Sequence, residues 1–250
     1  MSAYTGFSEV YDLFMDNIEY DMWGKYIISL LKEYCVNDGI VLDMGCGTGN
    51  ITEILAKEGY DMIGIDNSYD MLSVAMEKRS ENGLDEILYL CQDMREFELY
   101  GTVRAVVSVC DCMNYILDRD DMISVLKHVN NYLDPKGVFI FDLKTDTYYK
   151  KLGDKTIAEN RDESSFIWEN TYYDDEKINE YILTIYTKRE DEMYERIEEF
   201  HQQKAYGIDE IKALIEEAGM EFVCAYNAFT REDANEENDR IYIIARENGK

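Results

Sequence analysis

The sequence predicts an α/β fold with a mostly parallel sheet, helices on both faces and a small antiparallel β element. Apolar runs alternate with amphipathic segments between residues 40 and 143, and these runs are continuous, as in strands buried on both sides. Between residues 148 and 206 the hydrophobic period changes to two, which is typical of antiparallel strands with one face buried. The αβ pattern then returns, so we expect the antiparallel element to be an insert.

The first part of the chain contains five predicted strands and four helical segments. The strands are Ile40 to Asp43, Asp61 to Asp66, Ile87 to Cys91, Val103 to Val109 and Gly137 to Leu143. Helical patterns cover the tyrosine-rich residues 1–38, Asn50 to Glu58, Ser68 to Ser80 with Ser68 as its N-cap, and Asp118 to Leu133. A turn at Pro135–Gly137 is expected before the fifth strand.

The remaining residues are divided between the insert and the end of the core. Three antiparallel strands are predicted at Ser165 to Tyr173, Asn179 to Lys188 and Met193 to Lys204. A helix over Ile208 to Ala218 and strands over Met220 to Tyr226 and Arg240 to Ala245 complete a seven-stranded core. We therefore expect a core formed by residues 1–146 and 207–250, with residues 147–206 inserted as an antiparallel β subdomain for the substrate.

Charge and hydropathy narrow the expected partners and location. The chain has 25 basic and 53 acidic residues and a formal net charge of −28, a field that repels the phosphates of a nucleic acid. It has no run of 18 apolar residues that predicts a membrane span. The segment from Met1 to Phe7 lacks the basic and apolar regions of a signal peptide, so the expected location is the cytoplasm.

Cysteine and histidine usage gives no reason to expect a metal. There are six cysteines without a Cys-x-x-Cys pair, and only two histidines, His128 and His201. Most of the cysteines adjoin apolar runs, so we expect reduced thiols in the core.

The segment Val41 to Asn50, VLDMGCGTGN, is the most informative about function. An apolar strand leads into a glycine turn and a helix, an arrangement that brings backbone N–H groups close to a ligand. A dinucleotide fingerprint would need its third glycine at Asn50. The pattern Asp-x-Gly-x-Gly-x-Gly instead resembles the cofactor loop of class I S-adenosylmethionine-dependent methyltransferases, and its residues are Asp43, Gly45, Cys46, Gly47 and Gly49.

Further strand ends extend this resemblance. Asp66 ends the second predicted strand, where an acidic residue binds ribose hydroxyls in nucleotide-binding βαβ units; capping the next helix is its alternative role. By resemblance, Asn67 and Met71 flank the adenine, while Asp93 and the Met94 backbone contact its amino group. Cys110, after the fourth strand, lies near the methionine part of the cofactor.

The resemblance also implies a sheet order, a cofactor and a class of acceptor. The seventh strand would be antiparallel between the fifth and sixth, in a Rossmann-like sheet. The cofactor would be S-adenosyl-L-methionine and the product S-adenosyl-L-homocysteine. Small-molecule enzymes of this family, such as those acting on glycine or nucleotide-linked amino sugars, have an insert after the fifth strand that covers the acceptor. The predicted reaction is therefore methyl transfer to a nitrogen or oxygen of a small molecule.

The candidates for catalysis are His201, Asp111 and Tyr11. His201 is the only histidine of the insert and could act as a base; Asp111 and Asn114 follow the fourth strand, near the acceptor or as turn residues. Tyr11 and Trp23 could close over the cofactor, or could simply pack an amphipathic helix.

Two other functions remain open at this point. The chain could methylate RNA or protein, or it could bind S-adenosylmethionine without catalysis and act through its insert. The favoured reading has a small-molecule acceptor, no nucleic acid, no membrane and no metal, with the protein a monomer or homodimer.

Overall fold

The computed structural model describes residues 19–189 and 191–250, in which seven strands form a central sheet. Their order is β10-β11-β5-β4-β1-β2-β3. The neighbouring strands are parallel except that β11 is antiparallel to both β5 and β10. The bounds are β1 Ile40–Met44, β2 Asp61–Asp66, β3 Leu88–Cys91, β4 Val103–Ser108, β5 Leu133–Lys144, β10 Glu221–Asn227 and β11 Arg240–Arg246. This arrangement confirms the predicted fold class.

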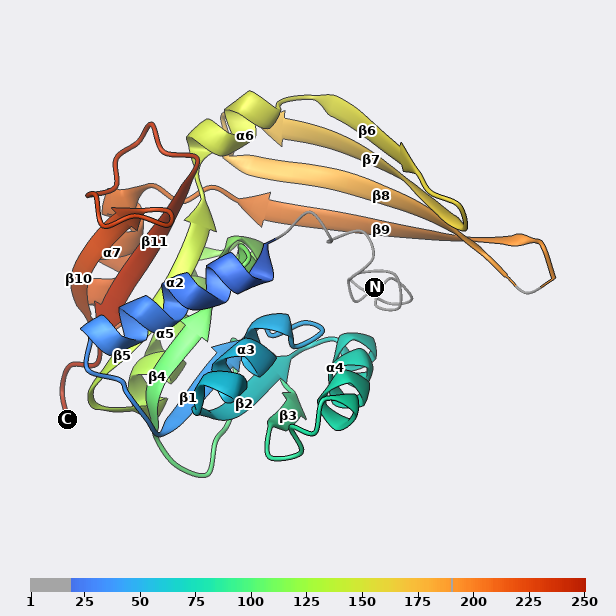
Figure 1. Ribbon diagram of the computed structural model, residues 1–250. Coiled ribbons are helices and arrows are strands. Elements are labelled where there is room, and N and C mark those ends of the chain that lie inside the picture. Colours follow the sequence, from blue (N-terminus) through green and yellow to red (C-terminus); the bar gives the residue numbers. More distant parts are fainter. Residues whose placement is uncertain (1–18, 190) are drawn as a thin grey trace.

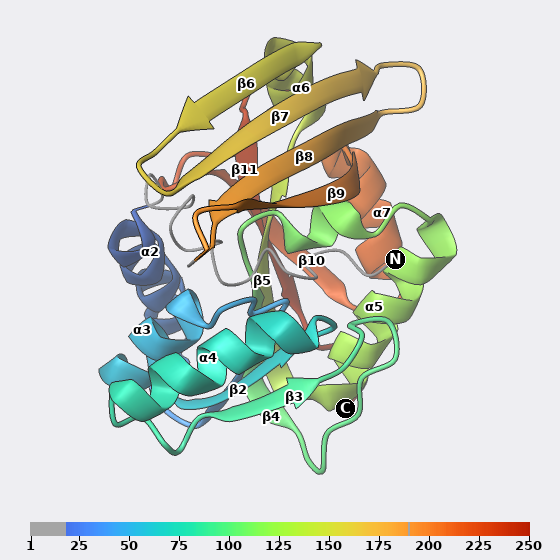
Figure 2. The same cartoon turned by 90° about the vertical axis from the view of Figure 1, so that its right-hand side faces the viewer.

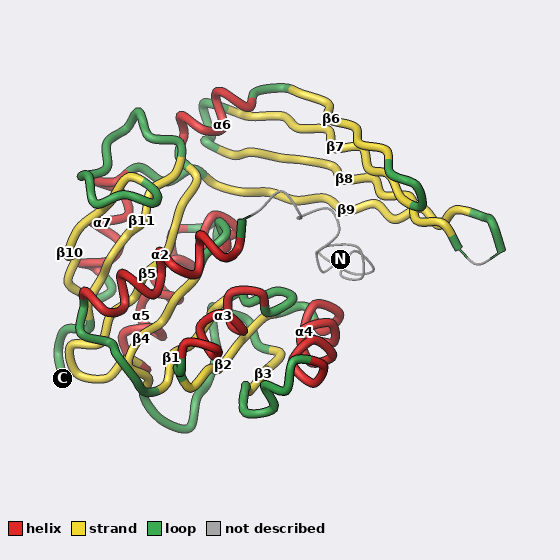
Figure 3. The backbone as a smooth tube through the Cα atoms, in the orientation of Figure 1, coloured by secondary structure: helices red, strands yellow, loops and turns green. Residues whose placement is uncertain are grey.

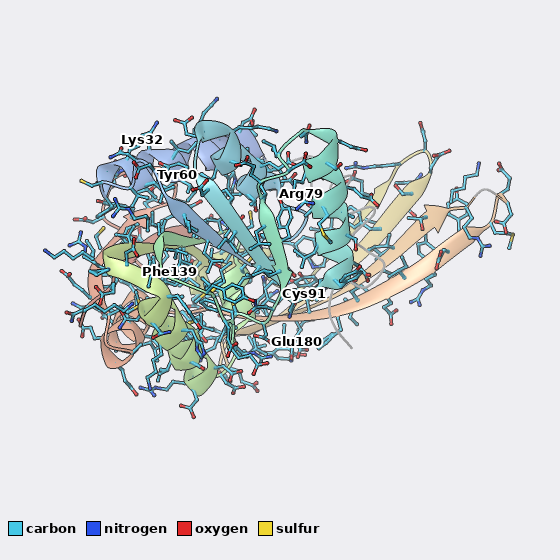
Figure 4. The ribbon with its side chains drawn as sticks, turned by 90° about the horizontal axis from the view of Figure 1, so that it is seen from below. Lys32, Tyr60, Arg79, Cys91, Phe139 and Glu180 are labelled. Carbon is cyan, nitrogen blue, oxygen red and sulfur yellow. The ribbon has the colours of Figure 1, made fainter. Side chains whose placement is uncertain are left out.

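Helices cover both faces of this sheet (Figure 1). On one face, α2 (Tyr20–Glu33), α3 (Asn50–Glu58) and α4 (Tyr69–Glu81) bury apolar side chains against the strands. On the other face, α5 (Arg119–Tyr132) and α7 (Ile208–Glu217) share a core with β5, including Phe139, which is labelled in Figure 4. Among the described helices, none combines the length and apolar character needed to cross a bilayer.

A second sheet lies beyond the carboxyl ends of the parallel strands (Figures 1 and 2). After α6 (Asp146–Leu152) the chain forms β6 (Lys155–Asn160), β7 (Ser164–Tyr173), β8 (Ile178–Lys188) and β9 (Tyr194–Lys204). Each of these strands is antiparallel to its neighbour, and we call them the insert sheet (Figure 3). The division of the chain at residues 147 and 206 remains a prediction.

The prediction of three insert strands was wrong by one strand. The missed strand, β6, has six residues that are all exposed, so it carries no alternation of apolar and polar burial. Pairing with β7, and not its own pattern, makes it a strand. The short helix α6 was missed as well; Thr145 caps it by accepting a hydrogen bond from the Tyr148 backbone.

The junction between α5 and β5 also differs from the prediction. The helix ends at Tyr132, and Leu133 already pairs with Val103 of β4. The next pair joins Ala105 to Val138, so between the two pairs one residue of β4 faces four of β5. The extra residues bulge out of the ladder, with Lys136 at φ +66°. The predicted Pro135–Gly137 turn is therefore an irregularity inside the strand.

Largely buried charged side chains meet where β4 and β5 end and β11 begins, and we call Asp111, Asp142, Lys144 and Arg240 the buried charge cluster. Arg240 donates to Asp142 and, at 2.8 Å, to Asp111. The Lys144 ammonium lies 3.0 Å from Asp111. Burial tends to raise the pKa of Asp111, but Lys144 and Arg240 outweigh it and hold that pKa below its usual range. Burial dominates at Asp142, raising its pKa to about 6.

This cluster is continuous with the contacts that hold the insert sheet. Gln203 of β9 donates a hydrogen bond of 2.7 Å to Asp111. Asn114, in the short 3₁₀ helix η1 (Cys112–Tyr115), donates to the carbonyls of Lys144 and Lys204 at 3.0 and 2.7 Å. The end of β9 is thereby fixed to the loop after β4.

Replacing Arg240 with methionine is expected to lower the free energy of unfolding by about 3–5 kcal/mol, because two buried carboxylates lose their shared cation. The matched control is Arg246→Met on the same strand, where the arginine is partly exposed and lies 3.7 Å from Glu221. That change should cost less than about 1 kcal/mol. Urea unfolding followed by circular dichroism measures both, and equal losses would contradict the role given to the cluster.

Candidate active site

The glycine loop after β1 has a backbone that only glycine adopts easily. Gly47 and Gly49 have φ values of +54° and +80°. A Cβ on Gly49 would lie 2.3 Å from the Tyr89 hydroxyl, whereas one on Gly47 would meet nothing within 4 Å. Gly49 therefore permits close packing at the start of α3, and Gly47 presents bare backbone to open space.

Asp66 holds this loop from the end of β2. One carboxylate oxygen accepts from the Gly47 backbone N–H and the other from the Ser68 N–H, both at 2.9 Å. Burial raises the pKa of Asp66, and these two hydrogen bonds oppose the rise. The Ser68 hydroxyl accepts from the Met71 backbone, which confirms the predicted N-cap. Asp66 is therefore part of the loop's architecture as well as a candidate ligand residue.

Asp43 lies beneath the loop and is only 2% exposed. It accepts a hydrogen bond of 2.6 Å from the Thr52 hydroxyl of α3. Burial raises its pKa to about 7, and the Thr52 hydroxyl opposes part of this rise. Because this pKa lies near neutral pH, a charged group bound beside Asp43 would change its protonation.

A cavity of about 300 Å³ opens over these residues, at the carboxyl ends of β1, β2, β3 and β4. Most of the predicted cofactor residues line it: Asp43, Gly45, Cys46, Gly47, Asp66, Asn67, Met71, Asp93, Met94 and Cys110. This is where ligands bind in open parallel sheets, since the strand order reverses between β1 and β4.

Among the predicted cofactor residues in the cavity wall, Asp93 is ion-paired and Cys110 is a thiol. Asp93 is held by Arg95, whose guanidinium and backbone N–H both donate to it, and these bonds lower its pKa. Cys110 lines the cavity together with Cys46 and Cys112, and burial raises the pKa of all three thiols. These thiols are neutral, so the wall around them offers no thiolate nucleophile.

Trp23 and Gly49 do not line the cavity. Trp23 is buried in α2, with its ring 5.0 Å from that of Phe229 and 4.8 Å from the Arg240 guanidinium. This packing agrees with the alternative role of Trp23, the packing of an amphipathic helix, and a contact of Trp23 with the cofactor stays a prediction. Tyr20, one turn earlier in α2, does line the cavity. Tyr11 lies outside the described residues.

The candidates for catalysis are separated by the structure. Asp111 does not line the cavity, and its carboxylate is held by Lys144, Arg240 and Gln203. These contacts support a structural role in place of the predicted catalytic one. His201 is 2% exposed and sits behind Tyr115, a cavity residue whose hydroxyl lies 3.3 Å from its Nδ1. His128 is in α5, where its Nδ1 contacts the Ser124 carbonyl.

Sequence reasoning missed Tyr115 and Glu199. Glu199 Oε2 is 3.0 Å from His201 Nε2. The spacing Glu-x-His in a strand of period two could have placed both on one face. Tyr115 lies within η1, and its position on the cavity depends on how that short helix turns. In the described residues, no group of three His, Cys, Asp or Glu side chains is arranged to hold a metal.

The strand order, the Asp43–Gly49 loop and Asp66 together form the architecture of a class I S-adenosylmethionine-dependent methyltransferase. Residues 41–137 match the family model described as a methyltransferase domain. The putative methyltransferase YqeM of Bacillus subtilis (strain 168) is 33% identical over 245 residues, covering 97% of this chain and 96% of that protein. The chain therefore belongs to the S-adenosylmethionine-dependent methyltransferases.

Solved structures of methyltransferases share this fold over nearly the whole length of the chain. The crystal structure of an S-adenosylmethionine-dependent methyltransferase from Clostridium acetobutylicum ATCC 824 has a TM-score of 0.86 and 28% identity, covering 98% of this chain and 99% of that one. The sugar N-methyltransferase KedS8 from Streptoalloteichus has a TM-score of 0.78 at 14% identity, covering 100% and 95%. At that identity the second match shows a shared fold.

The cavity residues fit S-adenosylmethionine. The open space over the Gly47 backbone can receive the cofactor, and Asp66 at its edge has carboxylate oxygens suited to ribose hydroxyls. Asp43 would lie near the methionine end and can take a negative charge opposite a cation. When bound, the cofactor supplies a methyl group carried on a sulfonium.

Asp66→Asn is expected to weaken binding of S-adenosylhomocysteine by about 10- to 100-fold, because an amide has one acceptor oxygen where the loop and the ribose need two. Isothermal titration calorimetry measures this. Asp61→Asn, at the exposed opposite end of β2, is the matched control and should bind normally. Unchanged affinity in Asp66→Asn would contradict the assignment.

The raised pKa of Asp43 predicts a pH dependence of stability. The folded pKa of about 7 exceeds the unfolded value of about 3.9, so the folded state holds the proton more tightly. The resulting stability is present at low pH and is lost as pH rises toward 7. Asp43→Asn cannot ionise and should lose less stability between about pH 5 and about pH 7, by up to about 1.4 kcal/mol per pH unit. Parallel urea-unfolding profiles of the two proteins would show that Asp43 does not titrate there.

Proposed function

We propose that this enzyme methylates a nitrogen or an oxygen of a small-molecule acceptor. The observation that carries the proposal is that the insert sheet packs directly against side chains of the cofactor cavity. Met71 lines the cavity and also packs under Ile185 of β8. Tyr115, likewise a cavity residue, contacts Tyr181 and His201 of the insert sheet.

These contacts limit the space for an acceptor. It must enter between the insert sheet and the carboxyl ends of the core strands, where aromatic and aliphatic side chains already meet. An acceptor of a few rings suits such a bounded site better than an extended macromolecule.

Charge supports the same conclusion. A formal net charge of −28 gives a long-range field that opposes RNA binding. KedS8, which shares the fold over the whole chain, is named a sugar N-methyltransferase. An amine of a small molecule is therefore a natural first class of acceptor to test.

The chain's own contribution to this reaction is mainly positional. Methyl transfer needs the acceptor atom in line with the methyl group, and holding two reactants in that geometry can supply effective molarities of about 10⁵ M or more. The neutral thiols of Cys46, Cys110 and Cys112 do not compete as nucleophiles. Asp111, held by two cations, is a poor proton acceptor.

The test incubates the protein with S-adenosylmethionine and a panel of small amines and alcohols, including glycine, ethanolamine and nucleotide-linked amino sugars. Release of S-adenosylhomocysteine, measured by mass spectrometry, is expected with a member of the panel and should fall at least 10-fold in Asp66→Asn under subsaturating cofactor.

Two results contradict the proposal. Methylation of total RNA or of a protein extract, with no turnover of the panel, identifies a macromolecular acceptor. Binding of S-adenosylhomocysteine without turnover of any of these acceptors identifies a non-catalytic binding protein.

A further inference from the structure

A chain of polar side chains leads from the cavity into the insert sheet. Tyr115 lines the cavity, and its hydroxyl lies 2.7 Å from the Tyr181 hydroxyl and 3.3 Å from His201 Nδ1. On the far side of the imidazole, Nε2 lies 3.0 Å from Glu199 Oε2. One tyrosine thus connects the cavity to a buried histidine–carboxylate pair.

The pair is fixed by the sheet that carries it. Glu199 and His201 are 6% and 2% exposed and occupy alternate positions of β9, on the face turned toward the core. Tyr181 is opposite His201 in the β8–β9 register, and the two rings stack at 4.5 Å. The imidazole is therefore held by a ring on its face and a carboxylate at its edge.

The contacts favour one placement of the protons on His201. An ionised carboxylate only accepts hydrogen bonds, so beside an ionised Glu199 the Nε2 of His201 would carry a proton and donate it. Nδ1 is then the unprotonated nitrogen and accepts from the Tyr115 hydroxyl. Such an imidazole can take up a second proton at Nδ1, the nitrogen that faces the cavity residue Tyr115.

One oxygen of Glu199 has no hydrogen bond of its own among the described residues. In the part of the chain that the structure describes, Glu199 Oε1 is buried and has no hydrogen-bond partner. A buried carboxylate with one oxygen unsatisfied is costly, and a cation beside it offsets that cost. The protonated imidazole would supply this cation 3.0 Å away.

We propose that Tyr115 contacts the acceptor and that His201, oriented by Glu199, takes up the acceptor's proton through it. The inference rests on the proposed function. As the acceptor's lone pair forms its bond to the methyl carbon, the bond from that carbon to the sulfonium would break, and its electron pair would stay on sulfur to give neutral S-adenosylhomocysteine. The N–H or O–H bond of the acceptor breaks in the same reaction, and its proton passes to the Tyr115 oxygen. The original hydroxyl proton of Tyr115 moves to His201 Nδ1, so Tyr115 ends neutral and His201 becomes an imidazolium paired with Glu199.

In this scheme Tyr115 is the catalytic residue, whereas His201 and Glu199 act through it. Tyr181 is a positioning residue in this scheme: its hydroxyl, 2.7 Å from that of Tyr115, would donate to it and leave the Tyr115 proton directed at His201. This assignment keeps the predicted importance of His201 but places it one side chain behind the cavity.

The first test needs no acceptor. With only two histidines in the chain, ¹⁵N-histidine labelling resolves both rings by NMR, and His128 is an internal reference. His201 is expected as the Nε2–H tautomer, with an Nδ1 signal that shifts in Tyr115→Phe while the His128 signals stay unchanged. The Nδ1–H tautomer, or no shift in Tyr115→Phe, would overturn the proposal.

The second test separates a relay from a structural contact. With an acceptor from the small-molecule panel, Tyr115→Phe and Glu199→Gln should lower kcat by about 100-fold with little change in the KM for S-adenosylmethionine. Glu198→Gln, the exposed neighbour on β9, is the matched control and should keep the wild-type kcat. Calorimetry with S-adenosylhomocysteine confirms that each variant folds and binds.

The outcomes distinguish the relay from the proposed function. If no small molecule is turned over, the proposed function fails, and the NMR result still decides whether Tyr115 and His201 share a proton. If turnover is found and kcat falls less than threefold in both Tyr115→Phe and Glu199→Gln, the chain of contacts is structural and the relay is wrong.

Discussion

The rest of this molecule depends on one interaction, the pairing of the Arg240 guanidinium with two carboxylates. It joins Asp142 in the central sheet to Asp111 in the loop after β4, with Lys144 as a second cation. Two buried carboxylates at adjoining strand ends would repel one another without it. Because Arg240 comes from β11, the last strand along the chain completes the buried charge cluster begun by β4 and β5. Trp23 packs over its guanidinium and brings α2 into the same unit.

The position of the insert sheet follows from this cluster. Gln203 reaches Asp111, and Asn114 bridges the carbonyls of Lys144 and Lys204. These bonds fix the last residues of β9. The pleat of the strand then determines which way its earlier side chains point. Because side chains alternate, fixing Gln203 toward the core also turns His201 and Glu199 toward it. The register of β9 thus determines the positions of Gln203, His201 and Glu199 together.

The cofactor half of the site could be predicted because it is local. Gly45, Gly47, Asp66 and Met71 follow strands whose ends must lie at one edge of a parallel sheet. Trp23 and Asp111 were predicted at the site because each has the residue type and approximate position of a site residue, but neither lines the cavity. Their actual partners, Phe229, Arg240 and Gln203, lie about a hundred residues or more away in the chain. The sequence pattern near Trp23 or Asp111 does not predict such long-range contacts.

The sequence by itself determined the αβ order, the glycine loop and the change of period that marks the insert. These features arise from burial and backbone geometry within a few residues of each position. Only the tertiary structure decided that β6 is a strand, that Asp111 is an ion-pair partner, and that Tyr115 meets His201. Each of these depends on side chains brought together by strand pairing and packing across the whole chain, and the free energy of such contacts is absent from any short segment.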